Sequence, residues 1–294
     1  MINTRITVTN NCYVVLCCLF STISGSNYGG AISVGGTGSC LKCESCKFFK
    51  VSSIQYHAAI YCDVYSTNSS VEKSDISYCS SPEYSGISLF SSTSLMSHVS
   101  AYLCHENAGV CANVVLIHIY GIQESNNINT SRTNANHHCG HNFHSAIDVK
   151  TSRFFNVANH RNTEFVFGMY QVPSNVILSY SNIVNNTVSW ALVYLNKLGS
   201  VKVSNFVFSS NIGPLTCNRG ILTGKGEFIG CVYDTASVNN GNGVITQINP
   251  VYNQNSATTY MIYEYQNYNC NPFSNHKMKI PRLLNSFVFV PLMI

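Results

Sequence analysis

The chain has 294 residues, of which 45% are hydrophobic and 10% charged, and its formal net charge is +4. The hydrophobic content excludes a disordered chain, and the shortage of Lys and Glu argues against a helical enzyme, whose surface normally carries them. Neutral polar, β-branched and aromatic residues take their place, which favours an all-β protein. The positive charges form no basic stripe, so we expect no nucleic-acid partner.

The first apolar stretch is the run 12–20, CYVVLCCLF, which follows the single Arg5. A secretory signal peptide has an apolar region of this length. However, no A-x-A-like cleavage site follows, and the run continues into a repeat. We therefore predict a lead-in strand at residues 1–11 and no clear signal peptide.

The repeat is an octet that ends in Ser or Asn and recurs at spacings of 25 to 29 residues. A second apolar strand usually follows the octet, such as residues 86–90 (GISLF) or 190–195 (WALVYL). Each repeat thus carries two or three short strands joined by Ser, Asn and Gly turns. The octets are CCLFSTIS (17–24), CKFFKVSS (46–53), SDISYCSS (74–81), SAYLCHEN (100–107), NINTSRTN (127–134), SRFFNVAN (152–159), SYSNIVNN (179–186), SNFVFSSN (204–211) and GCVYDTAS (230–237).

A period of this length with short strands predicts one coil of a parallel β-helix per repeat. The L-x-x-L-x-L frame of leucine-rich repeats is missing, and a β-propeller blade needs about 40 residues or more. One coil cannot bury its inward residues alone, so coils stack at about 4.8 Å along the axis. Asn side chains at equivalent corners can then pair amide to amide in a ladder. We expect this ladder at Asn107, Asn134, Asn159, Asn186 and Asn211.

Two short motifs add a family resemblance. Residues 29–32 (GGAI) and 208–211 (FSSN) match the GGAI and FxxN motifs of the polymorphic-membrane-protein repeats. Over residues 12 to about 250 the pattern resembles the right-handed parallel β-helix surface proteins of chlamydiae and of parasitic protists such as trichomonads. The resemblance implies adhesion or surface display, and it supplies no catalytic residues.

The fold prediction is a right-handed parallel β-helix of about nine rungs over residues 12–250. A capping segment is expected at 251–275 and an apolar tail at 276–294. The apolar part of that tail, 283–294, is shorter than the roughly 20 residues that a membrane-spanning helix needs.

The carboxylates predict no catalytic site. Polysaccharide-cleaving enzymes of this fold, such as pectate lyases and polygalacturonases, need clustered acids. The twelve acids here are scattered, although Glu44 and Glu72, 28 residues apart, fall on equivalent positions of adjacent coils. We therefore predict no catalytic residues and keep a polysaccharide-active lyase or hydrolase as an alternative.

Cysteine spacing suggests a metal site that the rest of the chain does not complete. Cys40, Cys43 and Cys46 form a C-x-x-C-x-x-C run, but no matching half-site follows it. Cys46 is equivalent to Cys18 in the repeat, so we interpret both as free, buried thiols.

Residues 137–144, HHCGHNFH, are the densest cluster of metal-ligand types. The cluster fills a strand position of normal length. Alternation puts Phe143 on the inward face, with Cys139 and His141 inside or at a corner. The remaining histidines are expected on the surface, and same-face pairs supply only two of the usual zinc ligands. We predict no metal and no cofactor.

The candidate ligand contacts are aromatic. The leading hypothesis is a non-catalytic surface or adhesion protein, cell-surface or secreted, that binds a host or cell-surface protein or glycan through its lateral sheets. The alternatives are the polysaccharide-active enzyme and a structural spacer without a ligand. The candidate contact residues are Trp190, Tyr194, Tyr260 and Tyr263.

Overall fold

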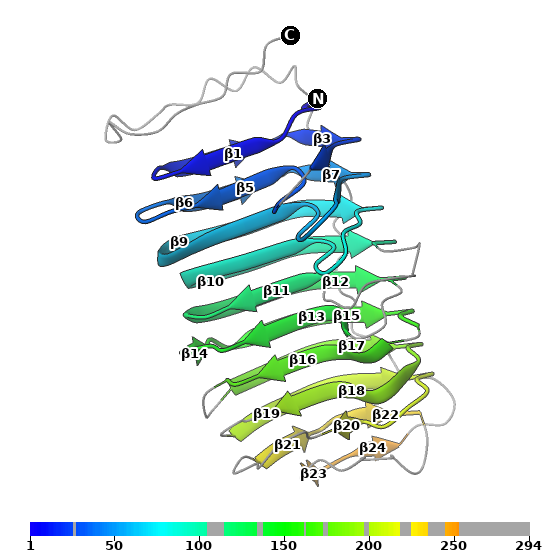
Figure 1. The fold of residues 1–294 in the computed structure, drawn as a ribbon. Coiled ribbons are helices and arrows are strands. Elements are labelled where there is room, and N and C mark those ends of the chain that lie inside the picture. Colours follow the sequence, from blue (N-terminus) through cyan, green and yellow to red (C-terminus); the bar gives the residue numbers. More distant parts are fainter. Residues whose placement is uncertain are drawn as a thin grey trace.

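The computed structural model describes residues 1–25, 28–104, 115–133, 138–161, 163–172, 176–196, 200–217, 225–234 and 245–252. This part of the chain is all-β, and it includes no helix long and apolar enough to cross a membrane. Its strands pair in parallel and stack as the coils of a β-solenoid (Figure 1). The predicted parallel β-helix is confirmed, while its right-handed winding stays a prediction.

Each coil passes through three strand faces. The first face stacks β1 (Ile6–Thr9), β5 (Ile32–Gly35), the start of β9 (Ile60–Ser77), the start of β10 (Ile87–Tyr102), β11 (Leu116–Ile119), β13 (His138–His144), β16 (Thr163–Tyr170), β18 (Val188–Asn196) and β20 (Thr216–Cys217).

The second face begins with β2 (Cys12–Leu16) and β6 (Cys40–Glu44), followed by the middle of β9 and β10. It continues through the start of β12 (Ile122–Ser131), β14 (Asp148–Val149), the start of β15 (Ser152–Ala158), the start of β17 (Val176–Val184), the start of β19 (Ser200–Ser209), β21 (Lys225–Ile229) and β23 (Ile245–Ile248).

The third face is the one that the octets mark. It stacks β3 (Leu19–Ser21), β7 (Lys47–Phe49), the ends of β9, β10, β12, β15, β17 and β19, β22 (Val232–Tyr233) and β24 (Val251–Tyr252). A separate small sheet pairs β4 (Ser24–Gly25) with β8 (Ser52–Ser53).

The solenoid extends slightly beyond both predicted limits, residues 12 and 250. β1, expected as a lead-in strand, pairs with β5 and so belongs to the first coil. β24 pairs with β22, which carries the stack to Tyr252. The remainder of the expected capping segment and the whole of the expected tail lie outside the described residues.

Two corners, each built on one left-handed residue, define the third face. The first corner precedes this face and the second follows it, and φ lies between +47° and +62° at every one of these residues. The two corners are five residues apart in every coil where both are described. The pairs are Cys17 and Thr22, Ser45 and Lys50, Lys73 and Tyr78, His98 and Leu103, Asn127 and Arg132, Phe154 and Asn159, Tyr180 and Asn185, and Asn205 and Ser210.

The corner residues bind the coils together through their backbone. The amide N–H of Asn159 donates to the carbonyl oxygen of Val184 in the next coil at 3.0 Å, and that of Asn185 donates to Ser209 at 2.8 Å. The same bond recurs from Thr22, Lys50, Tyr78, Leu103 and Arg132. Each corner therefore turns the chain and still satisfies a backbone donor that would otherwise face solvent or the core.

Inside the solenoid, equivalent side chains stack on one another. Phe20 and Phe48 are register partners on the third face, and their rings stack with centroids 4.9 Å apart. Phe208 and Tyr233 repeat the arrangement near the other end at 5.4 Å. Burial of one such aromatic ring stabilises the fold by roughly 1.5–3 kcal/mol, and each ring needs the neighbouring coil to be covered.

The GGAI motif forms the entry to the first face. Gly29 is left-handed, with φ +69°, and a Cβ on Gly30 would lie 2.3 Å from the carbonyl oxygen of Ala58. His57 takes the left-handed position in the next coil, with φ +57°. The motif therefore reflects a tight approach of two backbones, as expected for small residues at a corner.

The FxxN motif forms the second corner. The contacts there agree only in part with the predicted asparagine ladder. Asn186 donates from Nδ2 to Oδ1 of Asn211 at 3.0 Å, so these two amides do pair inside the corner. The position equivalent to Asn186 in the preceding coil is His160, whose N–H donates to Asn186 Oδ1 at 3.0 Å. Asn159 is instead the left-handed residue one position earlier, and its Oδ1 accepts from Asn185 on the outside. Asn107 and Asn134 lie outside the described residues.

A chain of hydrogen-bonded polar side chains runs through the interior of the middle coils. His118 is fully buried, with Ser94 Oγ 2.6 Å from Nδ1 and Ser125 Oγ 2.7 Å from Nε2. Ser125 Oγ also lies 3.1 Å from Nε2 of the buried His141. Burial lowers the pKa of His118 to about 3, because the charged imidazolium is costly in this environment.

Substitution at Asn185 tests the left-handed corner. Asn185→Val should lower the free energy of unfolding by about 1–2 kcal/mol relative to Asn185→Gly, since a β-branched residue is strained at positive φ and glycine is not. Both variants lose the same exposed amide, so their difference in urea denaturation isolates the backbone. Equal stability of the two variants would show that the corner imposes no such constraint.

Acid should destabilise the protein through its buried histidines. The unfolded state takes up a proton as pH falls through about 6.5, whereas folded His118 stays neutral until about pH 3, so stability is complete above pH 6.5 and is lost between these values. For His118 the loss between pH 6.5 and 5 is about 2 kcal/mol. Denaturant unfolding at the two pH values should show it. His118→Gln should lose less over the same interval, and an identical loss would contradict the assignment.

Candidate functional site

The outer surface of the third face carries an open groove of about 470 Å³. Two side chains per coil point outward between the two corners, and in the central coils most of these are small and polar. The groove is lined by Lys47, Asp75, Ile76, Ser77, Ser100, Tyr102, Asn129, Ser131, Arg132, Asn156, Ala158 and Asn159.

The floor of the groove is a column of register partners. Asp75 pairs with Ser100, Ser100 with Asn129, and Asn129 with Asn156 in successive coils. Asn156 donates from Nδ2 to Oδ1 of Asn129 at 3.0 Å. Because adjacent strands are about 4.8 Å apart, the column presents amide and hydroxyl groups at a regular spacing along the solenoid axis.

Asp75 is the one carboxylate among the described lining residues. Burial raises its pKa, and the charge of Lys47, its register partner in the preceding coil, opposes this effect. An acid with a pKa raised by desolvation, placed in a groove, is a physically reasoned candidate for a functional residue.

Tyr102 and Arg132 form one side of the groove. The Nη1 group of Arg132 donates to the Tyr102 hydroxyl at 3.0 Å, and the guanidinium carbon lies 5.7 Å from the centre of the ring. The hydrogen bond and the cation–π contact hold both side chains against the surface. The groove thus combines an ordered aromatic ring with fixed hydrogen-bonding groups.

This arrangement is suited to binding a polyhydroxylated ligand. Asn, Ser and Tyr side chains donate and accept hydrogen bonds without a charge to be neutralised. Glycoside hydrolysis in its usual form needs two carboxyl groups on either side of the bond that breaks, and Asp75 is alone in the groove. Glu44 and Glu72, which the spacing placed on adjacent coils, are register partners on the second face, and Lys42 and Lys73 form ion pairs with Glu44.

The expected aromatic contacts lie elsewhere. Trp190 is half-buried. Tyr194 is only 4% exposed, because its ring stacks on Phe165 at 4.6 Å, and Asn196 donates to its hydroxyl at 2.7 Å. This burial argues against direct ligand contact at Tyr194. Tyr260 and Tyr263 lie outside the described residues.

The residues that line the groove were not predicted from the sequence. Asp75, Ser100, Asn129 and Asn156 recur at intervals of about one coil, and all four fall inside the octets. Only the strand register shows that they share a column, because the octets do not all begin at equivalent positions of their coils.

Within the histidine-rich segment, His138–His144 form β13, so the described part of the segment is a strand, as predicted. His141 and Phe143 are both fully buried inside the solenoid, whereas the ring of His144 stacks on Tyr170 outside, with centroids 4.7 Å apart. The simple alternation is broken at Gly140, which has φ +81° and lies where the pairing with β16 shifts register. His137 and the side chains of His138 and Cys139 lie outside the described part of the structure.

Cys18 and Cys46 are free thiols, as predicted, but Cys18 is only partly buried. The hydrogen bond with Cys46 and, after it, burial raise the pKa of the Cys18 thiol, which keeps the thiol protonated at neutral pH. Cys43 is also a free, buried thiol, like Cys46 in the same C-x-x-C-x-x-C run.

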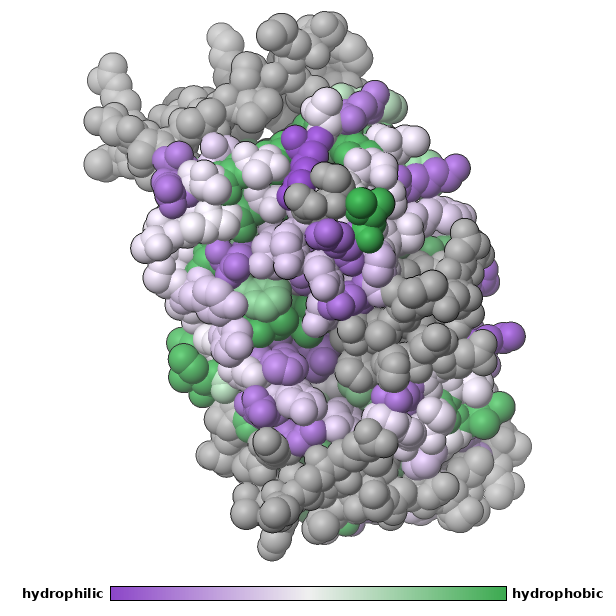
Figure 2. All heavy atoms as spheres, in the orientation of Figure 1, coloured by the Kyte–Doolittle hydropathy of each residue, from purple (hydrophilic) through white to green (hydrophobic). Residues whose placement is uncertain are grey.

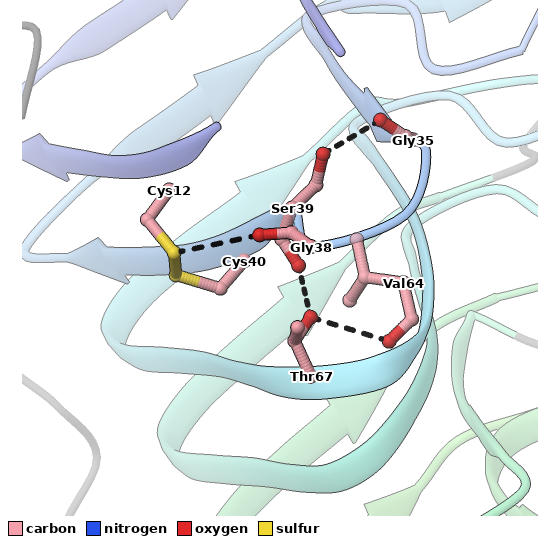
Figure 3. The surroundings of a disulfide bond; sticks show 7 residues. All are labelled: Cys12, Gly35, Gly38, Ser39, Cys40, Val64 and Thr67. Atoms are coloured by element: carbon pink, nitrogen blue, oxygen red, sulfur yellow. Dashed lines mark hydrogen bonds between the residues drawn. A yellow bond between two sulfur atoms is a disulfide. The ribbon is translucent and has the colours of Figure 1, made fainter. Parts of the chain in front are cut away.

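The first cysteine of that run, Cys40, forms a disulfide with Cys12 that was not predicted (Figure 3). The two residues are register partners on β2 and β6, so the bond ties the first coil to the second. Next to it, Ser39 donates to Gly35 O at 2.7 Å, and Thr67 of the third coil donates to Ser39 O. The separation of 28 residues, one coil, was the signal that could have found it.

Comparison with known proteins gives no further assignment. No protein-family model, no curated protein and no solved structure matches the chain.

Replacement of Asp75 should stabilise the protein. A carboxyl group whose folded pKa is raised opposes folding once it is ionised, at every pH above the unfolded value. Asp75→Asn should therefore raise the free energy of unfolding at pH 7, as measured by urea denaturation. Asp148→Asn, which changes an exposed acid, is the matched control and should leave stability unchanged. Destabilisation by Asp75→Asn would show that the carboxylate has a structural role.

Proposed function

We propose that the protein is a non-catalytic surface protein that binds a glycan in the groove of its third face. The observation that carries the proposal is the floor column, in which Ser100, Asn129 and Asn156 present hydroxyl and amide groups in register on successive coils. An extended saccharide chain lying along the axis can repeat the same contact from one coil to the next.

The side of the groove supports a sugar ligand in particular. Sugar rings have apolar faces as well as hydroxyl groups, and an aromatic side chain with a polar tip suits both. Tyr102 is such a residue, and Arg132 holds it in place. Lys47 and Arg132 add positive charge, which also makes the groove suitable for acidic sugars such as galacturonate.

Surface display or secretion is supported by two observations. The disulfide between Cys12 and Cys40 is of a kind that persists in oxidising compartments and is rare in the cytosol. The solenoid fold and the GGAI and FxxN motifs resemble the polymorphic-membrane-protein repeats, whose proteins are surface-displayed. We accordingly propose a cell-surface or secreted location.

Asp75 favours one alternative, a polysaccharide-active enzyme. Its raised pKa is a property that catalytic acids share. A lyase or hydrolase would turn over one member of a glycan panel, and Asp75→Asn would abolish that turnover. We expect binding without turnover, and turnover that depends on Asp75 would replace the binding proposal.

Glycan binding can be tested on the full chain. A panel of neutral oligosaccharides and oligogalacturonides, screened on an array and then by calorimetry, should contain a ligand with saturable binding. Tyr102→Ala should weaken that binding about tenfold, which corresponds to roughly 1.4 kcal/mol, and Asn129→Ala with Asn156→Ala should weaken it further.

Tyr180→Ala removes an exposed tyrosine at the first corner, outside the groove, and is the matched control. It should leave affinity unchanged. Absence of binding across the panel, or equal effects of Tyr102→Ala and Tyr180→Ala, would contradict the proposal and leave the ligand-free spacer as the better description.

A further inference from the structure

A second constellation lies on the first face, around Asp63. Asp63 points outward from β9, with Tyr61 two residues before it and Tyr65 two residues after it. Its register partner in β10 is Phe90. Three neighbouring positions around this carboxylate are thus aromatic, although they come from two coils.

The three rings are steeply inclined to one another and do not form a flat platform, while His57 and Tyr28 stack on the ring of Tyr61 and hold it in place. Tyr61 and Phe90 have centroids 5.6 Å apart and planes at 67°. Tyr65 and Phe90 are 6.2 Å apart at 70°. Rings at such steep angles enclose a compact group better than they stack on a flat sugar ring. Tyr65 is 56% exposed, so the enclosure is open to solvent.

The fourth position is open. The register partner of Asp63 in β5 is Gly35, which has no side chain. A Cβ built on Gly35 would meet only the carbonyl oxygen of Asp63, at 4.0 Å. The position that a side chain of the second coil would occupy next to Asp63 is therefore empty (Figure 1 shows β5, β9 and β10 stacked in this order).

Within the part of the chain that the structure describes, the Asp63 carboxylate has no cationic partner. Its Oδ2 accepts a hydrogen bond from the Tyr61 hydroxyl at 2.9 Å, while its Oδ1 is buried without a hydrogen-bond partner. Among the described residues no ion pair involves Asp63. A buried carboxylate oxygen without a partner is costly, and a bound cation would offset that cost.

Charge and ring chemistry together select the ligand. Aromatic faces attract cations, and the attraction adds to that of the carboxylate. Burial and, after it, the Asp63 charge raise the pKa of Tyr65, which places this ring in the field of the carboxylate. A hard metal ion would need about six oxygen ligands, and one carboxylate cannot supply them. A methylated ammonium instead needs apolar contact with the rings and a single counter-charge.

We propose that Asp63, Tyr61, Tyr65 and Phe90 form a binding site for a quaternary ammonium group. The site is separate from the groove of the third face, and the two proposals can fail independently. The wider surface is consistent with a small, local site, because Figure 2 shows hydrophobic residues on the visible face in small, separate areas.

Titration of the full chain with choline chloride tests the site, with 3,3-dimethylbutan-1-ol as an uncharged ligand of the same shape. Choline should bind saturably, followed by calorimetry or by the tyrosine ring signals in NMR, and the neutral alcohol should not. Nε-trimethyllysine as a second probe distinguishes a protein side chain from a free or lipid-borne choline group.

Variants locate the site. Asp63→Asn should weaken choline binding at least tenfold, and Gly35→Leu should do the same by filling the open side without touching the charge. Asp148→Asn, an exposed acid elsewhere, and Tyr102→Ala, in the groove, should leave binding unchanged. If Gly35→Leu does not fold, Tyr65→Ala replaces it as the second variant. Equal binding of choline and the alcohol, no saturable choline binding, or equal effects of Asp63→Asn and Asp148→Asn would overturn the proposal.

Discussion

The hydrogen bond that a left-handed corner residue donates to the next coil is the interaction on which the rest of this structure depends. A non-glycine residue at positive φ is strained by about 1 kcal/mol or more, and this chain accepts that strain repeatedly at both corners of the third face. The strain is offset because the bend places the amide N–H opposite a carbonyl oxygen of the following coil, at the second corner from Thr22 to Asn185 and at the first corner at Cys17 and Ser45. At the second corner, the coils from the first to the seventh are thereby each fixed to the next coil at the same point.

The constant spacing of the corners determines where variation can occur. The first and second corner residues are five apart in each described coil, from Cys17 and Thr22 to Asn205 and Ser210. The 25- to 29-residue variation of the period therefore falls outside the third face, in the remainder of the coil. On a face of constant length, outward side chains can form columns over many coils, and the polar floor from Asp75 to Asn156 lies on that face. The groove is in this sense a consequence of the corner geometry.

The repeat period in the sequence was enough to predict the fold. The positions of individual side chains depend on the register between coils, and these were predicted less well. The octets predicted the parallel β-solenoid, because stacked coils need equal lengths and a recurring corner. They could not separate Asn159 from Asn186, because asparagine suits both the left-handed position and the inward position after it. In the structure the first role belongs to Asn159 and the second to Asn186. A shift of one residue was enough to misplace one member of the ladder.

Binding residues were harder to predict for the same reason. The neighbours of Asp63 come from three coils, and the open side of its site depends on Gly35, one coil earlier in the chain. Likewise, the burial of Tyr194 depends on the ring of Phe165 in the preceding coil.

Amide hydrogen exchange tests the central claim most directly. If the corner residues bind one coil to the next, the amide protons of Lys50, Tyr78, Leu103, Arg132, Asn159 and Asn185 should exchange as slowly as those in the centres of the adjoining strands. Exchange at the rate of an unprotected loop at these positions, with the strands still protected, would contradict the account, because the corners would then turn the chain without holding the coils together.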